Sequence, residues 1–402
     1  MANVSSSSGL EKYPKLRFPG FDEPYVLHRI GDIYAERSER GVADIELLSV
    51  TMNDGVMQRS EIEGKDNSSE DKSNYKVVCK GDMVYNSMRM WQGANGVSSY
   101  DGIVSPAYTV LTAKIPICNE YFAALFKNYK LINEFRKNSQ GMTSDTWNLK
   151  YPQIETIKVY LPVIEEQEKI ASMLVTLEKR IAAQATLVEQ LKKYKRGVMQ
   201  RIFRNISVLS PSGFETVQLS SIFKKVSRRN SKGNIKNVIT NSAEYGLIPQ
   251  RDFFDKDIAV EGNTSNYYVI EQGDFVYNPR KSNTAPYGPF NRYEREERGI
   301  ISPLYTCLVL QAHIEPSYLA WYFKSDAWYR YIYDNGSQGV RHDRVSMTDD
   351  LLMGIPVIIP SKEAQLKIAK LLDCLESRFQ TELFQYESLK SIRVALLQQL
   401  FI

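Results

Sequence analysis

The chain has 402 residues, of which 43% are hydrophobic and 24% charged, and its 51 basic and 47 acidic side chains give a formal net charge of +4. This composition excludes a disordered chain, collagen and a coiled coil throughout, and the length suffices for about two or three hydrophobic cores. The four cysteines form no C-x-x-C pair and the three histidines lie far apart, which argues against a disulfide framework and a metal site. No apolar run has the length of a membrane span and no signal peptide opens the chain, so we expect a cytoplasmic protein.

Residues 1–20 are a serine-rich tail, and residues 21–160 alternate short β-branched and aromatic runs with Gly, Asn, Asp and Pro. Runs such as 75–78 and 108–111 are typical of strands, and 120–135 has the pattern of a helix. This alternation predicts a mixed α/β domain over residues 21–160.

The next segment, residues 161–205, has the pattern of one long helix. Pro162 stands at its expected first turn, and apolar residues then recur in alternating steps of four and three. Such a heptad pattern is typical of a coiled coil. Its apolar positions are Ile170, Leu174, Leu177, Ile181, Val188, Leu191, Val198 and Ile202, and Lys195 is one of the polar residues that interrupt them.

Residues 206–358 and 359–402 repeat the domain and the long helix in the same order. The second helix has a heptad pattern of its own, interrupted among other positions at Arg393. The matching blocks are SNYKVVCKGDMVYN from Ser73 with SNYYVIEQGDFVYN from Ser265, at nine of fourteen positions, GIVSPAYTVL from Gly102 with GIISPLYTCL from Gly299, at seven of ten, and LPVIEEQEKIASML from Leu161 with IPSKEAQLKIAKLL from Ile359, at seven of fourteen.

This duplication predicts an α+β fold with two similar mixed α/β domains in tandem, each followed by a long helix. Two such helices in one chain can pair as an antiparallel coiled coil with a pseudo-twofold axis, which would place one domain at each end of a rod of about 60 Å. The alternative that each helix packs only on its own domain stays open.

With these motifs the chain resembles the specificity subunit of type I restriction-modification enzymes. The resemblance covers nearly the whole chain, and the duplicated order is more specific than any single motif. The motifs are LRFPGF from Leu16, Gly-Asp-x-Val-Tyr-Asn from Gly81 and Gly273, Ser-Pro-x-Tyr from Ser105 and Ser302, and Pro-x-x-Glu-x-Gln-x-Lys-Ile-Ala from Pro162 and Pro360.

The resemblance implies two target recognition domains that each read one half of a split, asymmetric sequence in double-stranded DNA, with the paired helices as the spacer. It also implies that two methyltransferase subunits dock on the chain and that two restriction and translocase subunits can join them. S-adenosylmethionine, ATP and Mg²⁺ would then belong to these partners. The chain itself is expected to have no catalytic residue, cofactor, metal or membrane partner.

Candidate DNA-binding residues lie where the two repeats diverge, because bases are read by directional donors and acceptors while basic side chains contribute affinity. Two basic clusters, at 192–204 and 224–236, flank the start of the second domain and add phosphate-facing candidates. The candidates are Arg89, Trp91, Gln92, Asn95, Gln140, Thr143, Ser144 and Trp147 in the first repeat, and Lys224, Arg228, Arg280, Lys281, Asn283, Gln338, Arg341, His342 and Arg344 in the second.

The start of each long helix is a candidate partner surface. Its polar residues are Glu165, Gln167 and Lys169 in the first repeat and Glu363, Gln365 and Lys367 in the second. These residues contact the methyltransferase subunits or cap their helix, and the sequence leaves both readings open. The repeated Gly-Asp-x-Val-Tyr-Asn and Ser-Pro-x-Tyr blocks are interpreted as turns and packing, because two domains that read different bases share them.

Two other functions stay open. The first is a self-contained DNA-modifying enzyme, against which the absence of a glycine-rich cofactor turn and of an Asn-Pro-Pro-Tyr motif counts. The second is a coiled-coil adaptor that does not bind DNA, which salt-sensitive binding to duplex DNA would exclude.

Overall fold

The computed structural model describes residues 2–3, 12–40, 45–52, 54–66, 68–206, 210, 213–252, 264–336, 343–345 and 347–402. The chain divides into two compact units. The first unit consists of Met1–Thr186 with Phe384–Ile402, and the second consists of Leu187–Leu383. Two long helices, α5 (Ile164–Arg204) and α11 (Lys362–Gln399), each contribute to both units.

The first unit contains an antiparallel four-stranded sheet in the order β4-β11-β8-β9. Two-stranded pairs β5-β6, β7-β10 and β3-β12 surround it. The strands are β1 (Ala2–Asn3), β2 (Leu16–Arg17), β3 (Val26–Arg29), β4 (Tyr34–Glu36), β5 (Leu48–Thr51), β6 (Gly55–Gln58), β7 (Lys76–Val78), β8 (Met83–Asn86), β9 (Asn95–Val97), β10 (Gly102–Val104), β11 (Tyr108–Ala113) and β12 (Lys158–Leu161). The helices are α1 (Ile30–Ile33), η1 (Arg59–Glu61), η2 (Met90–Gln92), α2 (Asn119–Leu125), α3 (Tyr129–Asn138) and α4 (Tyr151–Ile154).

The second unit repeats this arrangement with a sheet in the order β14-β21-β18-β19 and the pairs β15-β16, β17-β20 and β13-β22. Its strands are β13 (Phe214–Gln218), β14 (Phe223–Val226), β15 (Ile239–Ser242), β16 (Gly246–Pro249), β17 (Tyr268–Ile270), β18 (Phe275–Tyr277), β19 (Phe290–Arg292), β20 (Gly299–Ile301), β21 (Thr306–Leu310) and β22 (Pro356–Pro360). Its helices are α7 (Leu219–Ile222), η3 (Gln250–Asp252), α8 (Pro316–Lys324), α9 (Tyr329–Asn335) and α10 (Asp349–Met353). The predicted duplication of a mixed α/β domain is therefore confirmed.

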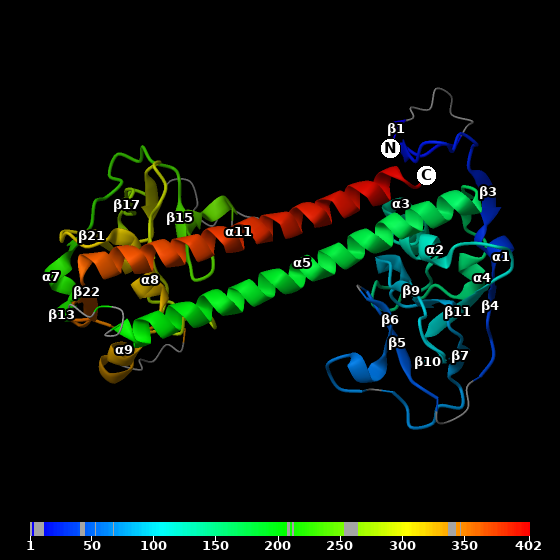
Figure 1. The fold of residues 1–402 in the computed structure, drawn as a ribbon, viewed down its shortest axis with the longest axis horizontal. Coiled ribbons are helices and arrows are strands. Elements are labelled where there is room, and N and C mark those ends of the chain that lie inside the picture. Colours follow the sequence, from blue (N-terminus) through cyan, green and yellow to red (C-terminus); the bar gives the residue numbers. More distant parts are fainter. Residues whose placement is uncertain are drawn as a thin grey trace. The chain divides into compact units, whose positions relative to one another are not determined.

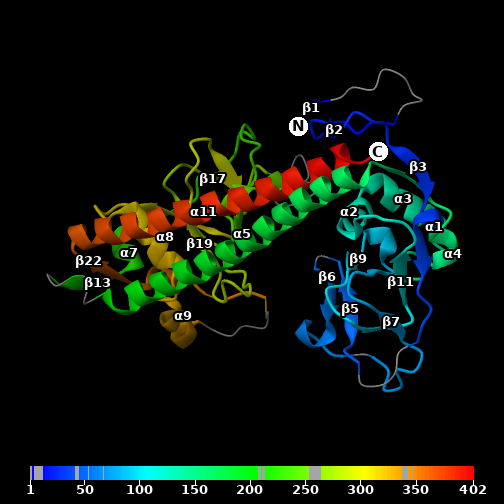
Figure 2. The ribbon, with the colours of Figure 1, turned by 45° about the vertical axis from the view of Figure 1, so that its right-hand side comes forward.

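Within each unit the two long helices run side by side in opposite directions (Figures 1 and 2). One ion pair joins Arg393 of α11 to Glu178 of α5 in the first unit, and another joins Lys195 to Glu376 at 2.5 Å in the second. Both pairs belong to one antiparallel register, because the 17 residues from Glu178 to Lys195 match the 17 from Arg393 back to Glu376. The predicted antiparallel pairing of the helices is confirmed.

The ends of both helices also belong to the domain cores. In the first unit the core includes Ile170 near the start of α5 and Phe401 just after α11, whose ring lies 5.2 Å from that of Tyr121. In the second unit it includes Phe203 near the end of α5 and Leu372 of α11. The apolar pattern of each helix therefore serves two contacts, since its ends pack on a domain and its remaining part packs on the other helix.

The described residues contain neither a membrane-spanning helix nor a cluster of metal ligands. No described helix is long and apolar enough to cross a membrane. No group of three or more His, Cys, Asp or Glu side chains in the described ranges is placed to hold a metal ion.

Candidate nucleic-acid interface

The same turn precedes strand β8 in the first domain and strand β18 in the second. Gly81 and Gly273 have φ of +94° and +92°, a left-handed conformation that glycine adopts without strain. One carboxylate oxygen of the following Asp82 accepts a hydrogen bond from the backbone N–H of Cys79 at 2.8 Å, and Asp274 accepts the same bond from Glu271 at 2.9 Å. The structure thus gives the Gly-Asp blocks the turn role that was interpreted from the sequence.

Each turn aspartate also binds an arginine of the same domain. The Arg37 guanidinium donates to Asp82 at 2.9 Å, and Arg228 pairs with Asp274 in the equivalent way. Burial raises the pKa of Asp274, although Arg228 beside it acts in the opposite direction. Arg228 is a DNA-binding candidate, and the structure shows that its charge also neutralises a buried carboxylate. Because its side chain is 37% exposed, its contact with DNA stays a prediction. Lys224, on β14, has an exposed side chain.

The first divergent stretch of the first domain follows β8 and contains helix η2. Arg89 is exposed, and Trp91 and Gln92 are half-buried. Asn95 is fully buried and its amide donates to the carbonyl oxygen of Gly93 at 3.0 Å. The DNA-binding prediction for Asn95 is therefore replaced by a role in closing this loop, since its side chain has no access to a ligand.

The second divergent stretch of the first domain follows α3, and the fold brings it to the first. Gln140, Thr143 and Ser144 are exposed, while Trp147 is half-buried. The rings of Trp91 and Trp147 meet edge to face with centroids 5.2 Å apart. The two stretches, which are about fifty residues apart in sequence, thus form one surface.

The second domain brings its two divergent stretches together through the backbone. Lys281 donates its N–H to the carbonyl oxygen of Asp343, and Val345 donates to that of Pro279, both at 2.9 Å. Arg280 and Arg344 face each other in an antiparallel bridge. Arg280 and Asn283 are exposed, and Lys281 and Arg344 are half-buried. Gln338, Arg341 and His342 lie outside the described residues.

Three residues that the sequence analysis missed belong to these surfaces. Arg136 lies over the ring of Trp147, with its guanidinium carbon 5.7 Å from the ring centroid. Met88 is 39% exposed and its carbonyl oxygen accepts the indole N–H of Trp91 at 3.0 Å. Asn148 has a buried side-chain oxygen without a hydrogen-bond partner. Met88 and Asn148 could have been found from the sequence, because the two repeats differ at these positions. Arg136 could be found only from its contact with Trp147 in the structure.

The predicted partner residues separate into two groups. Glu165 and Lys169 are exposed, and so are Glu363 and Lys367, which form an ion pair at 2.6 Å along α11. Gln167 and Gln365 are both 4% exposed. Their amides are bound within the chain, as the hydrogen bonds to Cys118 and Pro162, and to Glu315 and Pro360, show. For these two glutamines the structure replaces partner binding by attachment of each helix to its own domain.

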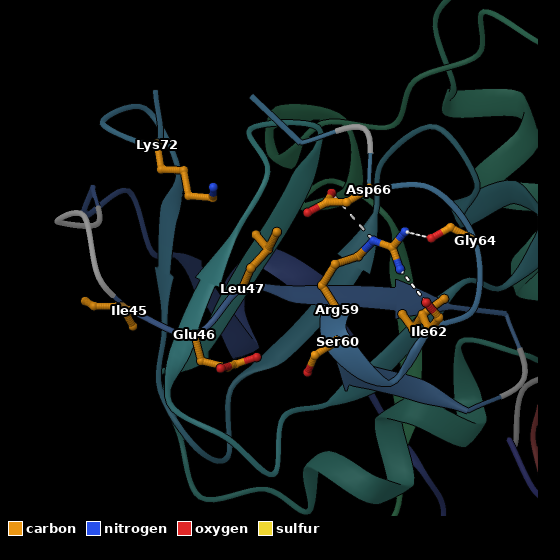
Figure 3. A pocket seen from close by; sticks show the side chains of 9 residues that line it. All are labelled: Ile45, Glu46, Leu47, Arg59, Ser60, Ile62, Gly64, Asp66 and Lys72. Atoms are coloured by element: carbon orange, nitrogen blue, oxygen red, sulfur yellow. Dashed lines mark hydrogen bonds and ion pairs between the residues drawn. The ribbon is translucent and has the colours of Figure 1, made fainter. Parts of the chain in front are cut away.

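A cavity of about 620 Å³ lies beside helix η1 of the first unit. Figure 3 shows the Arg59 side chain turned toward the carbonyl groups of Ile62 and Gly64 and toward Asp66. The Arg59 guanidinium donates to those two carbonyl oxygens at 2.7 and 3.1 Å. Because its donors are used by the loop that forms the wall, this arginine stabilises the loop and is not aimed at a ligand.

Part of the chain matches a known protein family. Residues 39–193 match the family model described as the type I restriction modification DNA specificity domain. This part of the chain is similar to the DNA specificity domain of type I restriction-modification enzymes. The chain is 29% identical over 136 residues to the type I restriction enzyme MjaVIII specificity subunit of Methanocaldococcus jannaschii, which is 33% of this chain and 31% of the relative. A putative MjaX specificity subunit of the same organism is 24% identical over 166 residues, which is 39% of this chain and 38% of that relative.

The chain thus spans less than two fifths of the length of both curated relatives. Solved structures match over nearly the whole chain. The S subunit of a type I restriction-modification system from M. genitalium has a TM-score of 0.57 at 15% identity, with 97% of this chain and 99% of that chain covered. The HsdS subunit from Thermoanaerobacter tengcongensis has a TM-score of 0.51 at 16% identity, with 97% and 98% covered. At these identities the structures establish a shared fold.

Proposed function

We propose that this chain is the subunit that selects the DNA sequence for a type I restriction-modification enzyme, and that it reads a bipartite, asymmetric target. The observation that carries the proposal is the pair of divergent surfaces. In each domain, two stretches that differ between the repeats come together on a scaffold that the repeats share. A duplicated scaffold with different reading loops suits a protein that binds two different half-sites of one duplex.

The chemistry of the two surfaces suits base recognition in a groove. Exposed Arg89 and Gln140 in the first domain, and exposed Arg280 and Asn283 in the second, offer the donors and acceptors that base edges need. Exposed basic side chains such as Lys224 can contact phosphates, which contributes affinity without sequence preference. The two domains would then read different bases because their loops carry different side chains.

The helix pair is the proposed spacer between the half-sites. Its register is the same in both units, as the two equivalent ion pairs indicate. A spacer of fixed register gives a fixed number of unread base pairs, in the same way that the spacing of a dimeric protein's recognition elements fixes the spacing of its half-sites. This part of the proposal is independent of which bases the loops read.

The exposed side chains at the start of each helix are the proposed docking sites for two methyltransferase subunits. Glu165 and Lys169 in the first repeat and Glu363 and Lys367 in the second occupy equivalent positions, so one partner surface would fit both. S-adenosylmethionine would bind to these partners, and ATP and Mg²⁺ to restriction and translocase subunits that join the complex. The chain itself would be non-catalytic.

The test is the methylation pattern of DNA treated with this chain in complex with the methyltransferase subunit encoded beside it. We expect N6-methyladenine, mapped by single-molecule sequencing, in a split asymmetric motif with a constant gap. A chain in which residues 206–358 are replaced by those of another family member should change one half of the motif and keep the other half and the gap.

Three results would contradict the proposal. A continuous palindromic motif would exclude two separate reading domains. Failure to form the complex would exclude the proposed docking role. Binding of S-adenosylmethionine by the purified chain alone would favour a self-contained DNA-modifying enzyme.

A further inference from the structure

Arg280 and Arg344 occupy a defined place in the reading surface of the second domain. The bond from the N–H of Val345 to the carbonyl oxygen of Pro279 has an equivalent in the first domain, where Leu149 donates to Ser87 at 2.8 Å. Arg280 directly follows Pro279 and Arg344 directly precedes Val345. The same two positions in the first domain hold Met88 and Asn148. The two domains thus differ in charge at matched positions of one scaffold.

The two arginine side chains lie on one face of the loop pair. Residues directly opposite in an antiparallel bridge have Cβ atoms roughly 4.5–5.5 Å apart and project to the same side. Both guanidinium groups are also near enough to the hydroxyl of Tyr305 to affect its pKa. Burial raises the pKa of Tyr305, and the positive charges of Arg280 and Arg344 act against that rise.

The charge of this arginine pair is only partly neutralised. Asp343 lies 3.5 Å from the Arg344 guanidinium. Among the described residues no carboxylate forms an ion pair with Arg280, whose side chain is exposed. Two like charges on one face destabilise the free protein, so their arrangement favours a bound group that is rich in hydrogen-bond acceptors.

The loop that carries Arg280 is held in place before any ligand binds. The Asn278 side-chain oxygen accepts a hydrogen bond from the backbone N–H of Arg280 at 3.0 Å. The backbone N–H of Lys281 donates a hydrogen bond to the carbonyl oxygen of Asp343. Gly288, with φ of +86°, closes the loop against the carbonyl oxygen of Asn278, where any Cβ would collide. A rigid backbone fixes the direction of the guanidinium groups, which is what recognition of one base edge requires.

We propose that Arg280 and Arg344 recognise guanine in the half-site that the second domain reads, and this inference rests on the function proposed above. Guanine presents two acceptors, O6 and N7, in the major groove, and the arginine fork donates to both at once. The half-site of the second domain therefore contains at least one G·C pair that these arginines specify. The first domain, with Met88 and Asn148 in the same places, does not use this contact.

The experiment uses the complex of the full chain with its methyltransferase subunits and maps methylated motifs for the wild type and for Arg280→Gln, Arg280→Lys and Arg344→Gln. Both glutamine variants should lose about tenfold or more of the preference for G·C at a position of the half-site that the 206–358 replacement alters, since one bidentate contact discriminates bases by about that factor or more. The other half-site and the gap should be unchanged. Arg298→Gln is the matched control, because this arginine is exposed and pairs with Glu271 away from the bridge.

A phosphate contact would give a different result. In that case Arg280→Gln would weaken binding to all sequences alike and lower the salt dependence of binding, with the motif unchanged, and Arg280→Lys would behave as the wild type. That outcome, or a half-site of the second domain without any G·C pair, overturns the inference while the proposed function stands. If the wild-type complex gives no split motif, the proposed function fails and the inference fails with it.

Discussion

The two units share one scaffold but attach their long helix in different ways. In the first unit, Arg17 forms a bidentate ion pair with Glu166 of α5, with N–O distances of 3.0 and 2.8 Å. Both side chains are inaccessible, at 3% and 0% exposure. In the second unit the position of Glu166 is taken by Ala364, which is buried. The same helix-to-domain junction is therefore built once around a charge pair and once without one.

This difference shows that a junction of this kind can be built without an ion pair. Taking two charges out of water costs about as much as their attraction returns, so a buried ion pair is often no better than well-packed apolar residues. Burial alone would lower the pKa of Arg17, yet the Glu166 carboxylate raises it above its ordinary value, because each charge is tied to the other. Loss of one partner is then far more harmful than loss of both.

The largest predicted effect follows from this asymmetry. Glu166→Ala should destabilise the first unit by about 3–5 kcal/mol, because it leaves Arg17 buried and unpaired. The double variant Arg17→Met with Glu166→Ala should recover most of that loss, since it makes the first junction resemble the second. Hydrogen exchange of the β3 and β12 amides measures the first unit separately.

Glu165→Ala is the matched control, because Glu165 is the exposed neighbour of Glu166 on the same helical turn. A surface change of this kind is expected to stay within about 0.5 kcal/mol. If Glu166→Ala and Glu165→Ala have equal effects on exchange, removal of Glu166 does not leave Arg17 as a costly buried charge, and the prediction is wrong.

A second prediction concerns what the two junctions share. Gln167 accepts from the N–H of Cys118 at 3.2 Å and donates to the carbonyl of Pro162 at 3.0 Å. Gln365 makes the same two bonds in the second unit, with Glu315 at 2.9 Å and with Pro360 at 2.8 Å. Replacing either glutamine by leucine should cost about 1–3 kcal/mol in its own unit, because buried backbone groups lose their partners.

Gln167→Leu and Gln365→Leu should lower the stability of their units by similar amounts. The ion pair of Glu166 has no such counterpart in the second unit. Site-resolved hydrogen exchange of each unit provides the measurement. Glu168→Leu is a suitable control, since Glu168 is exposed and the second repeat has leucine at the same position. An effect of Gln167→Leu no larger than that of Glu168→Leu would mean that the repeated glutamine is not a structural link.

The sequence was informative where a pattern repeats and uninformative where a single side chain had to be placed. Duplication and heptad spacing predicted two domains and two long helices, because both are properties of many residues at once. Asn95 and Arg228 were taken as DNA contacts since their residue types suit base and phosphate binding. Only the fold shows that one is enclosed and the other neutralises Asp274.

The internal ion pair of Arg228 could have been predicted from the repeat alone. Arg37 stands in the first repeat at nearly the same distance from Asp82 as Arg228 from Asp274, and a pair present in both repeats is better explained by the scaffold than by base reading. The contact between Trp91 and Trp147, in contrast, could not have been predicted from the repeat. It joins two divergent loops, and nothing in either loop's sequence specifies the other as its neighbour.

The smallest predicted effect concerns the helix pair, where the two units are most alike. The pairs of Lys195 with Glu376 and of Arg393 with Glu178 are partly exposed, so each should contribute only about 0.2–1 kcal/mol, and less at high salt. Hydrogen bonds from Gln380 and Lys195 lower the pKa of Glu376 below its ordinary value of 4.5, although burial by itself raises it.

A carboxylate with a lowered pKa stabilises the fold fully above its unfolded pKa, and that contribution is lost as the pH falls through the folded value. We therefore expect Glu376→Gln to lower the stability of the second unit at pH 7 and to have little effect once the pH lies below the folded pKa of Glu376. Exchanging the charges of one pair, as in Glu376→Lys with Lys195→Glu, should restore most of the loss at pH 7, because the register places the two groups face to face. The Lys195 ammonium lies 4.4 Å from the centroid of the Phe379 ring. A double variant that is less stable than both single variants would show that this packing contributes more stability than the ion pair.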